Sequence, residues 1–291
     1  MQLFVNDLTV MDFSYLCHER GMVGESWIVD VILDGDLNEE SMVQDFSIVK
    51  KNLKRLIDEY VDHKLLVPAE HTATTVINSG DESEVEVRFQ SADKHQIMLR
   101  CPAEAYAFIY SDAVTKVSVG DYLKEIIATH LPDNVDNITL NLRTEVIDVP
   151  YYHYTHGLKK HDGNCQRIAH GHRSRVDLFI NDLMCSASQQ YWARRWADIY
   201  IATEEDVIDF AERKITGEID NEIDYWCFGY ESSQGYFELI MPKSRCEVIT
   251  TDSTVECLAQ FMYEQQKQRL PGNKVKVIAY EGVGKGAMVS D

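Results

Sequence analysis

The chain has 291 residues, of which 45% are hydrophobic, and its formal net charge is -20. This length allows one large domain or two of ordinary size, and the hydrophobic fraction is sufficient for a packed core. The negative charge argues against nucleic acid or an anionic membrane as a partner.

The seven cysteines are widely spaced, and the sequence has no C-x-x-C pair. An odd number of cysteines without such pairs favours a reduced protein with free thiols. Residues 1–10 lack the basic segment and apolar run of a signal peptide, and no stretch approaches the roughly 20 apolar residues of a membrane span. We therefore expect a soluble cytoplasmic protein.

The first half of the chain alternates between strand and helix patterns. Residues 27–33 form a predicted strand, and apolar residues at helical spacing predict an amphipathic helix over 42–60. Alternation of apolar and charged residues over 84–89 indicates a half-buried antiparallel strand. A second helix is predicted around residues 119–127, followed by a strand over 138–142.

The second half shows a similar order. Residues 176–180 form a predicted strand, and Thr203-x-x-Asp206 resembles a capping box that opens the counterpart of the first helix. Ser253-x-x-Glu256 is predicted to cap the second helix, over residues 254–269. Val275 and Val277 mark the strand that follows.

Three short matches recur in the same order in both halves and indicate an internal duplication. Val29-Asp30-Val31 resembles Val176-Asp177-Leu178, and Val43-Gln44-Asp45-Phe46 resembles Val207-Ile208-Asp209-Phe210. Leu131-Pro132 likewise resembles Leu270-Pro271. We predict two units, 1–145 and 146–291, each of the α+β class with helices against one face of an antiparallel sheet.

A histidine-rich segment follows the boundary between the units. His170 and His172 are separated by one residue, so on a strand they point to the same face. His156, on the preceding strand, would complete three nitrogen ligands, the number that a catalytic zinc site uses. The alternative is a chance group of surface histidines; His153 and His161 lie in the same segment and receive no role.

Several motifs together resemble one enzyme family. They are Thr155-His156-Gly157, Cys165-x4-His170-Gly171-His172, Val43-x-Asp45-Phe46, Asp62-His63 and Ser253-Thr254-x-Glu256. These resemble the family of 6-pyruvoyltetrahydropterin and 6-carboxytetrahydropterin synthases. The resemblance implies two tandem units of the tunnelling fold, each a four-stranded antiparallel sheet with two helices on one face.

The resemblance also implies the chemistry and its residues. The family's substrate is 7,8-dihydroneopterin triphosphate, and its Zn²⁺ would be bound here by His156, His170 and His172. Cys165 corresponds to the family's general base, and Asp62 and His63 to the pair that assists it. Glu281 matches the glutamate that anchors the pterin, with Glu145 as a lower-ranked candidate. Thr254 and Glu256 are further expected contacts to the substrate.

The sequence departs from the family pattern in both halves. Val23-Gly24-Glu25 stands where the second half has His170-Gly171-His172, and Cys17 lies one place away from the position equivalent to Cys165. The first half should therefore bind no zinc, while the second half should have lost its Asp-His pair through a deletion of that segment. Four residues separate Cys165 from His170, where the family's subgroups usually have three or five, which leaves the product open.

Three functions remain open at the level of sequence. We favour synthesis of 6-carboxytetrahydropterin, the activity that supplies the 7-deazaguanine and queuosine pathway. The alternatives are 6-pyruvoyltetrahydropterin synthesis and a degenerate fusion that binds a pterin or purine without converting it. For all three we expect a small-molecule ligand and neither nucleic acid nor membrane as partner.

The complementary losses predict one composite site for each chain. The first half keeps Asp62 and His63, and the second half keeps Cys165 and the three histidines. We expect one zinc per chain, at an interface between a first half and a second half, either within one chain or between two chains. Because family members close a barrel from several units, we also expect a homo-oligomer, with three chains replacing six single units.

Overall fold

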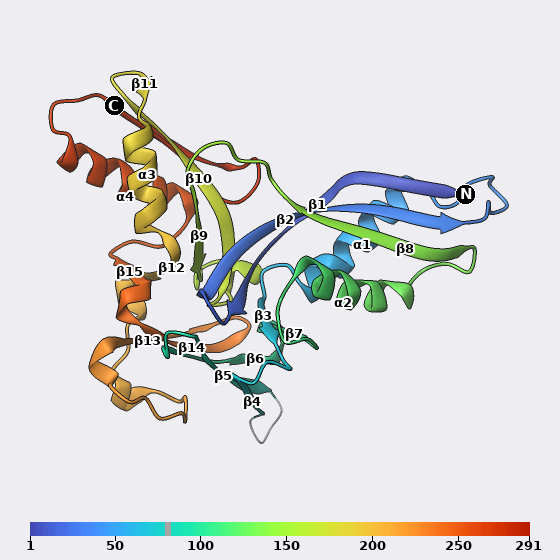
Figure 1. The fold of residues 1–291 in the computed structure, drawn as a ribbon, viewed down its shortest axis with the longest axis horizontal. Helices are drawn as coiled ribbons and strands as arrows, with labels where there is room; N and C mark the ends of the chain where they lie inside the picture. The colour runs from blue at the N-terminus through green and yellow to red at the C-terminus, as the bar shows by residue number, and fades with distance from the viewer. Residues whose placement is uncertain (79–82) are drawn as a thin grey trace.

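The computed structural model describes residues 1–78 and 83–291. The strands form three sheets, and the four α-helices cover two of them (Figure 1). Each of these two sheets is built by one half of the chain, whereas the third sheet takes strands from both halves. The chain termini lie at opposite ends of the molecule in Figure 1.

The first half forms a sheet with strand order β7-β3-β1-β2-β8. Its long strands pair antiparallel, and the two short strands at one side run parallel to β1. Buried residues of both helices share one core with the sheet, so the helices cover the same face. The elements are β1 (Gln2–Cys17), β2 (Gly21–Gly35), α1 (Phe46–Tyr60), β3 (Leu65–Pro68), β7 (Tyr106–Ile109), α2 (Lys116–Ala128) and β8 (Val135–Thr144).

The predicted first helix is confirmed and begins at Phe46. The Asp45 carboxylate caps it by accepting hydrogen bonds from the backbone N–H groups of Ser47 and Ile48. Its buried face consists of Val49, Leu53, Leu56 and Ile57, which are spaced as an amphipathic helix requires.

The second half forms a sheet with strand order β15-β12-β9-β10-β16-β17, and β11 pairs with β10 beside it. Trp192, Trp196 and Met262 anchor the core between this sheet and its two helices. The elements are β9 (Tyr151–His156), β10 (His170–Ile180), β11 (Leu183–Met184), α3 (Ser186–Arg195), β12 (Ala197–Thr203), β15 (Cys246–Ile249), α4 (Val255–Arg269), β16 (Val275–Tyr280) and β17 (Gly286–Ser290).

The helix predicted to begin at Thr203 is wrong. Residues 204–206 and 210–212 form single 3-10 turns, and the first helix of this half is α3, which lies earlier in the chain. Asp206 ends the first of these turns, and its buried carboxylate lies 2.7 Å from Lys159 Nζ. The 3-10 helices are η1 (Ala103–Ala105), η2 (Asn164–Gln166), η3 (Glu204–Asp206), η4 (Phe210–Glu212), η5 (Glu222–Asp224) and η6 (Lys243–Arg245).

This correction changes which residues correspond between the halves. Asp62 and His63 follow α1, and the residues that follow α3 in the same way are Ala197 and Asp198. His63 and Asp198 share a left-handed backbone, with φ of 55° and 54°. The second half has therefore not lost the segment that holds the Asp-His pair; it carries Ala-Asp there instead.

The third sheet joins the halves. Its order is β13-β14-β6-β5-β4, and the register of β14 on β6 places Leu239 opposite Leu99. Residues of both halves form the core beneath it, which explains why the halves pack as one body. Its strands are β4 (Thr74–Asn78), β5 (Glu84–Gln90), β6 (Gln96–Pro102), β13 (Tyr225–Ser232) and β14 (Gly235–Pro242).

A second junction lies where β2 crosses β9 and β10. A side chain on Gly24 would place its Cβ 1.9 Å from the Tyr154 carbonyl oxygen and 2.7 Å from His172 N. On the other strand, a Cβ on Gly171 would lie 2.6 Å from Gly24 Cα. The two glycines thus let the backbones of the two halves touch.

The α+β class and the two helices on one face of each half's sheet agree with the sequence analysis. Strands β11 and β17 and the sheet shared between the halves were not predicted. Within the described residues, every helix is too short or too polar to cross a lipid bilayer.

Gly24→Ala should lower the free energy of unfolding by at least about 2 kcal/mol, because neither neighbouring backbone can yield to a methyl group. Chemical denaturation measures this. Gly120→Ala is the control. Gly120 lies in helix α2, and the nearest atom to an added Cβ would be Leu142 Cδ1 at 3.9 Å, so this change should leave the free energy of unfolding unchanged or raise it. Equal effects of the two changes would refute the backbone contact.

Candidate metal centre and active site

The three predicted histidines meet at the start of β10. His156, the last residue of β9, lies opposite His170 in the antiparallel register, and His172 follows on the same face as His170. All three side chains are buried, and one possible ligand atom from each lies within 4.8 Å of the others. The strand geometry that the sequence predicted therefore brings the three imidazoles to one point.

Each imidazole has an oxygen atom on its outer side. His156 Nδ1 lies 3.0 Å from the Ser253 carbonyl oxygen, and His170 Nδ1 lies 3.1 Å from that of Arg167. His172 Nδ1 lies 3.2 Å from Asp12 Oδ1. At His156 and His170 the hydrogen bond at Nδ1 fixes the tautomer and leaves Nε2 free to bind a metal, whereas the Asp12 carboxylate faces His172 Nδ1 at ion-pair distance without a hydrogen bond.

The free nitrogens fit a metal ion. Nε2 of His156 and both ring nitrogens of His172 are buried without a hydrogen-bond partner among the described residues, which costs free energy unless something binds there. Burial, reinforced by the neighbouring imidazoles, lowers the pKa of His156 and of His170 well below the usual range. Neutral imidazole is the form that ligates metals.

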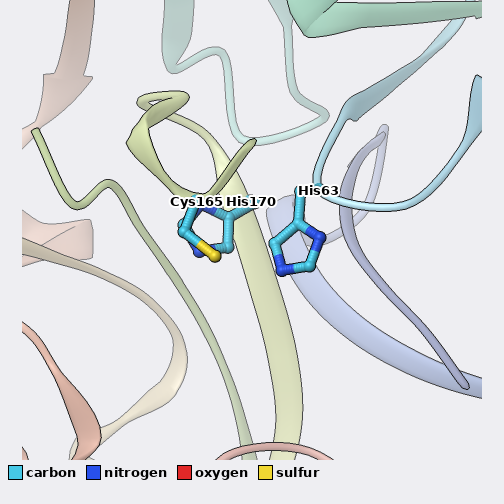
Figure 2. Close-up of side chains that lie close together, drawn as sticks. All are labelled: His63, Cys165 and His170. Atoms are coloured by element: carbon cyan, nitrogen blue, oxygen red, sulfur yellow. The ribbon is translucent and has the colours of Figure 1, made fainter. Parts of the chain in front are cut away.

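A second group of ligand-type side chains shares His170. Cys165, in η2, and His63, after α1, lie so that sulfur and ring nitrogens of the three residues are within 4.8 Å of one another (Figure 2). The rings of His63 and His170 have centroids 5.2 Å apart. Residues from the first and the second half of the same chain therefore form this group.

The Asp-His pair is held rigidly. His63 Nδ1 lies 2.6 Å from Asp62 Oδ2, and Asp62 Oδ1 accepts a hydrogen bond from the Asp12 backbone N–H at 2.7 Å. Burial opposes a charge on His63, but Asp62 and the neighbouring Cys165 raise its pKa to about 10. The left-handed backbone of His63 is uncommon for a residue with a side chain, and such conformations cluster at functional sites.

The turn after β16 brings Glu281 to the histidines, where its Oε1 lies 3.9 Å from His172 Nε2. Ser174 Oγ accepts a hydrogen bond from the Gly282 N–H at 2.9 Å and fixes this turn. Of the two candidate anchors, Glu281 is the one whose carboxylate lies beside a histidine of the metal centre. For Glu145, the backbone carbonyl oxygen accepts a hydrogen bond from Arg173 Nη1.

The other two predicted substrate contacts lie at the start of α4. Thr254 caps this helix by accepting a hydrogen bond from the Cys257 N–H, and Glu256 is exposed. The predicted cap, Ser253, is wrong: its hydroxyl and carbonyl oxygens both lie 3.0 Å from His156 Nδ1. Ser253 therefore orients an imidazole instead of capping the helix.

Sequence reasoning missed Asp12 and Ser253. The sequence offered a signal for Asp12, because an acidic residue stands between the apolar residues Met11 and Phe13; the structure shows that it is buried. Carboxylates are rarely buried without a partner. No local pattern marks Ser253, because its contact with His156 spans 97 residues.

The sequence model of the family described as 6-pyruvoyl tetrahydropterin synthase matches residues 15–141 and again 145–290. The chain belongs to the 6-pyruvoyl tetrahydropterin synthase family. The two successive matches confirm the prediction of two tandem tunnelling-fold units, and membership supports a pterin-processing lyase. The gap between the matches lies next to the proposed boundary after Glu145.

Solved structures of this family match about half the length of the chain. The Plasmodium vivax 6-pyruvoyl tetrahydropterin synthase is 15% identical over 51% of this chain and 93% of its own, with a TM-score of 0.41. The Plasmodium falciparum enzyme is 14% identical over 49% of this chain and 90% of its own, with a TM-score of 0.40. Among curated proteins there is no match.

The pseudo-symmetric position in this family member carries a salt bridge in place of the metal centre. Arg20 Nη2 lies 2.5 Å from Asp198 Oδ1 and Arg20 Nε lies 3.0 Å from Asp198 Oδ2. Asp198 corresponds to His63, and Glu25 to His172. Among the described residues, both groups of three possible metal ligands include His170, and no such group lies around Arg20 and Asp198.

We expect about one divalent metal ion per chain. His170→Ala combined with His172→Ala should abolish binding, because the one remaining imidazole cannot hold the ion. Arg20→Ala should leave the metal content unchanged and lower the free energy of unfolding by about 1 kcal/mol, since it breaks a partly exposed ion pair. Metal analysis and denaturation of the purified variants check both; two ions per chain, or metal loss in Arg20→Ala, would contradict this assignment.

Proposed function

We propose that this chain is a zinc-dependent lyase that converts 7,8-dihydroneopterin triphosphate into 6-carboxytetrahydropterin. The observation that carries the proposal is the convergence of three buried imidazoles beside Cys165 and the Asp62–His63 pair within one chain. Imidazole nitrogens in a three-ligand site suit zinc. When bound, zinc would polarise the side-chain hydroxyl and carbonyl oxygens of the substrate.

The chain's own residues would move the protons. Cys165 is the proposed general base: a cysteine removes protons as the thiolate, a form that a neighbouring imidazolium stabilises. His63, with a pKa of about 10, would supply that positive charge and return a proton to the substrate. Asp62 holds the His63 ring through Nδ1, so that its other nitrogen can face the reacting groups.

Glu281 is the proposed anchor for the pterin ring. Its carboxylate lies on the accessible side of the histidine cluster, with 21% of the side chain exposed, while the histidines themselves are buried. A carboxylate can accept two charge-assisted hydrogen bonds from the ring N–H and amino groups. Thr254 and Glu256 are proposed as further contacts from the start of α4.

One observation favours the alternative product, 6-pyruvoyltetrahydropterin. The matching family model and the similar solved structures are both described as 6-pyruvoyl tetrahydropterin synthases. That reaction would begin from the same substrate and use the same base and metal, so the two proposals differ in the bonds broken afterwards. Mass spectrometry of the product from 7,8-dihydroneopterin triphosphate distinguishes them.

Cys165→Ala should lower kcat by at least about 100-fold, because it removes the proposed general base. The matched control is Cys17→Ala, which removes the thiol at the end of β1, one place from the sequence position equivalent to Cys165. Turnover of the zinc-loaded protein is the measurement. If the wild-type protein binds the substrate without converting it, the chain is a binding protein; if Cys17→Ala and Cys165→Ala lose activity equally, Cys165 is not the base.

Glu281→Ala should weaken pterin binding by about 2 kcal/mol, because ring donors lose a charged acceptor. Titration calorimetry with a pterin measures the dissociation constant. Glu256→Ala is the comparison, since its exposed carboxylate should matter less. A larger loss from Glu256→Ala would move the anchor to α4, and an unchanged constant in both variants would make Glu145 the next candidate.

We also propose a trimer. β8 is an outer strand of the first half's sheet, and an open edge is a surface for pairing with another copy. Because family members close a barrel from several units, three tandem chains of 33.4 kDa each should replace six single units. Light scattering at micromolar concentration should give three times the chain mass, and a monomer would contradict the proposal.

A further inference from the structure

Asp12 is a buried carboxylate in β1 at the centre of the contact between the halves, with 4% of its side chain exposed. Its Oδ1 accepts a hydrogen bond from Ser26 Oγ at 2.5 Å and lies 3.2 Å from His172 Nδ1. Its Oδ2 lies 3.2 Å from Lys285 Nζ. All of these contacts belong to one chain, but Asp12 comes from the first half and His172 from the second.

The backbone of the same residue holds the Asp-His pair. The Asp12 N–H donates to Asp62 Oδ1 at 2.7 Å, and the Asp12 carbonyl oxygen accepts from the His63 N–H at 2.7 Å. The side chain of Asp12 therefore faces a metal ligand while its peptide groups fix the two residues that assist the base.

We propose that Asp12 is a positioning residue for the metal centre. Its carboxylate orients His172 of the second half, and its peptide groups hold the Asp62–His63 pair of the first half beside that centre. The inference rests on the proposed metal site. A carboxylate at Nδ1 of a ligating histidine fixes the ring orientation and makes Nε2 a better ligand. Lys285 balances the buried negative charge at the mouth of the site.

The surrounding residues are adapted to this carboxylate. Gly282 has φ +68°, and a Cβ there would lie 2.5 Å from Asp12 Oδ1, so the turn that carries Glu281 passes directly over it. The corresponding residue in the second half is His153, whose Nδ1 binds the Gly24 carbonyl oxygen at 2.7 Å. Asp12 thus lies on β1, which faces the metal centre. Its counterpart His153 lies on β9, near Arg20 and Asp198.

Asp12→Asn tests the inference, because it keeps the side-chain volume and removes the charge. Zinc affinity is measured by competition with a chelator on the folded protein, and the dissociation constant should rise 10- to 100-fold. The visible absorption of the cobalt-loaded protein should also change, which a purely structural role would not cause. Asp30→Asn is the matched control: Asp30 lies in β2 and pairs with Arg143, away from the metal centre, so its affinity should equal that of wild type.

A second variant guards against misfolding of Asp12→Asn. Ser26→Ala removes the hydroxyl that holds Asp12 Oδ1, and it should weaken zinc binding about fivefold. Affinities within twofold of wild type for the folded variants would overturn the role of Asp12 and leave the proposed function intact. A wild-type protein that binds no metal would overturn both.

Discussion

The close contact between Gly24 and Gly171 is the constraint on which the site depends. Any side chain at Gly24 would enter the backbone of Tyr154 and His172, so the strands of the two halves can meet only because both positions lack a Cβ. This contact is buttressed by a hydrogen bond between the buried hydroxyls of Ser14 and Thr155 at 2.7 Å. It brings Asp12 to His172 and His63 to Cys165.

Two sites related by the duplication lie on either side of this contact, and they have diverged in opposite ways. One has three imidazoles, a thiol and an Asp-His pair; the other has Tyr15, Glu25 and the Arg20–Asp198 salt bridge. Glu25 is buried, and burial raises its pKa, which is unfavourable for a metal ligand that must be ionised. Among the described residues, one position therefore has the side chains that could hold a metal ion, while the second position joins the halves through an ion pair.

Sequence patterns predicted the parts of the fold that follow from local periodicity. The helix with Val49, Leu53 and Leu56 on one face and the strand geometry of His170 and His172 are confirmed. α3 was missed because Ser188 and Gln189 lie on its buried face, where Gln189 donates to the Val176 carbonyl oxygen. A hydrophobic pattern cannot reveal a buried face of hydrogen-bonded polar residues.

The contacts that sequence could not predict are those made across the two halves. The pairing of β14 with β6 and the approach of Asp12 to His172 join residues far apart in the chain. The false match at Asp209–Phe210 arose because Asp209 caps a single 3-10 turn with the same side-chain hydrogen bond that caps α1 at Asp45. Local capping chemistry indicates a turn of helix without fixing its length.

Co-expression of a Cys165→Ala chain with a His63→Ala chain tests the central claim that each composite site forms within one chain. Each variant should be inactive alone, because each lacks one of the two residues proposed to transfer protons. The isolated mixed oligomers should remain inactive, whereas oligomers that mix wild-type chains with a chain carrying both changes should retain activity in proportion to their wild-type content. Restored turnover in the first mixture would show that the site is shared between chains and would contradict this account.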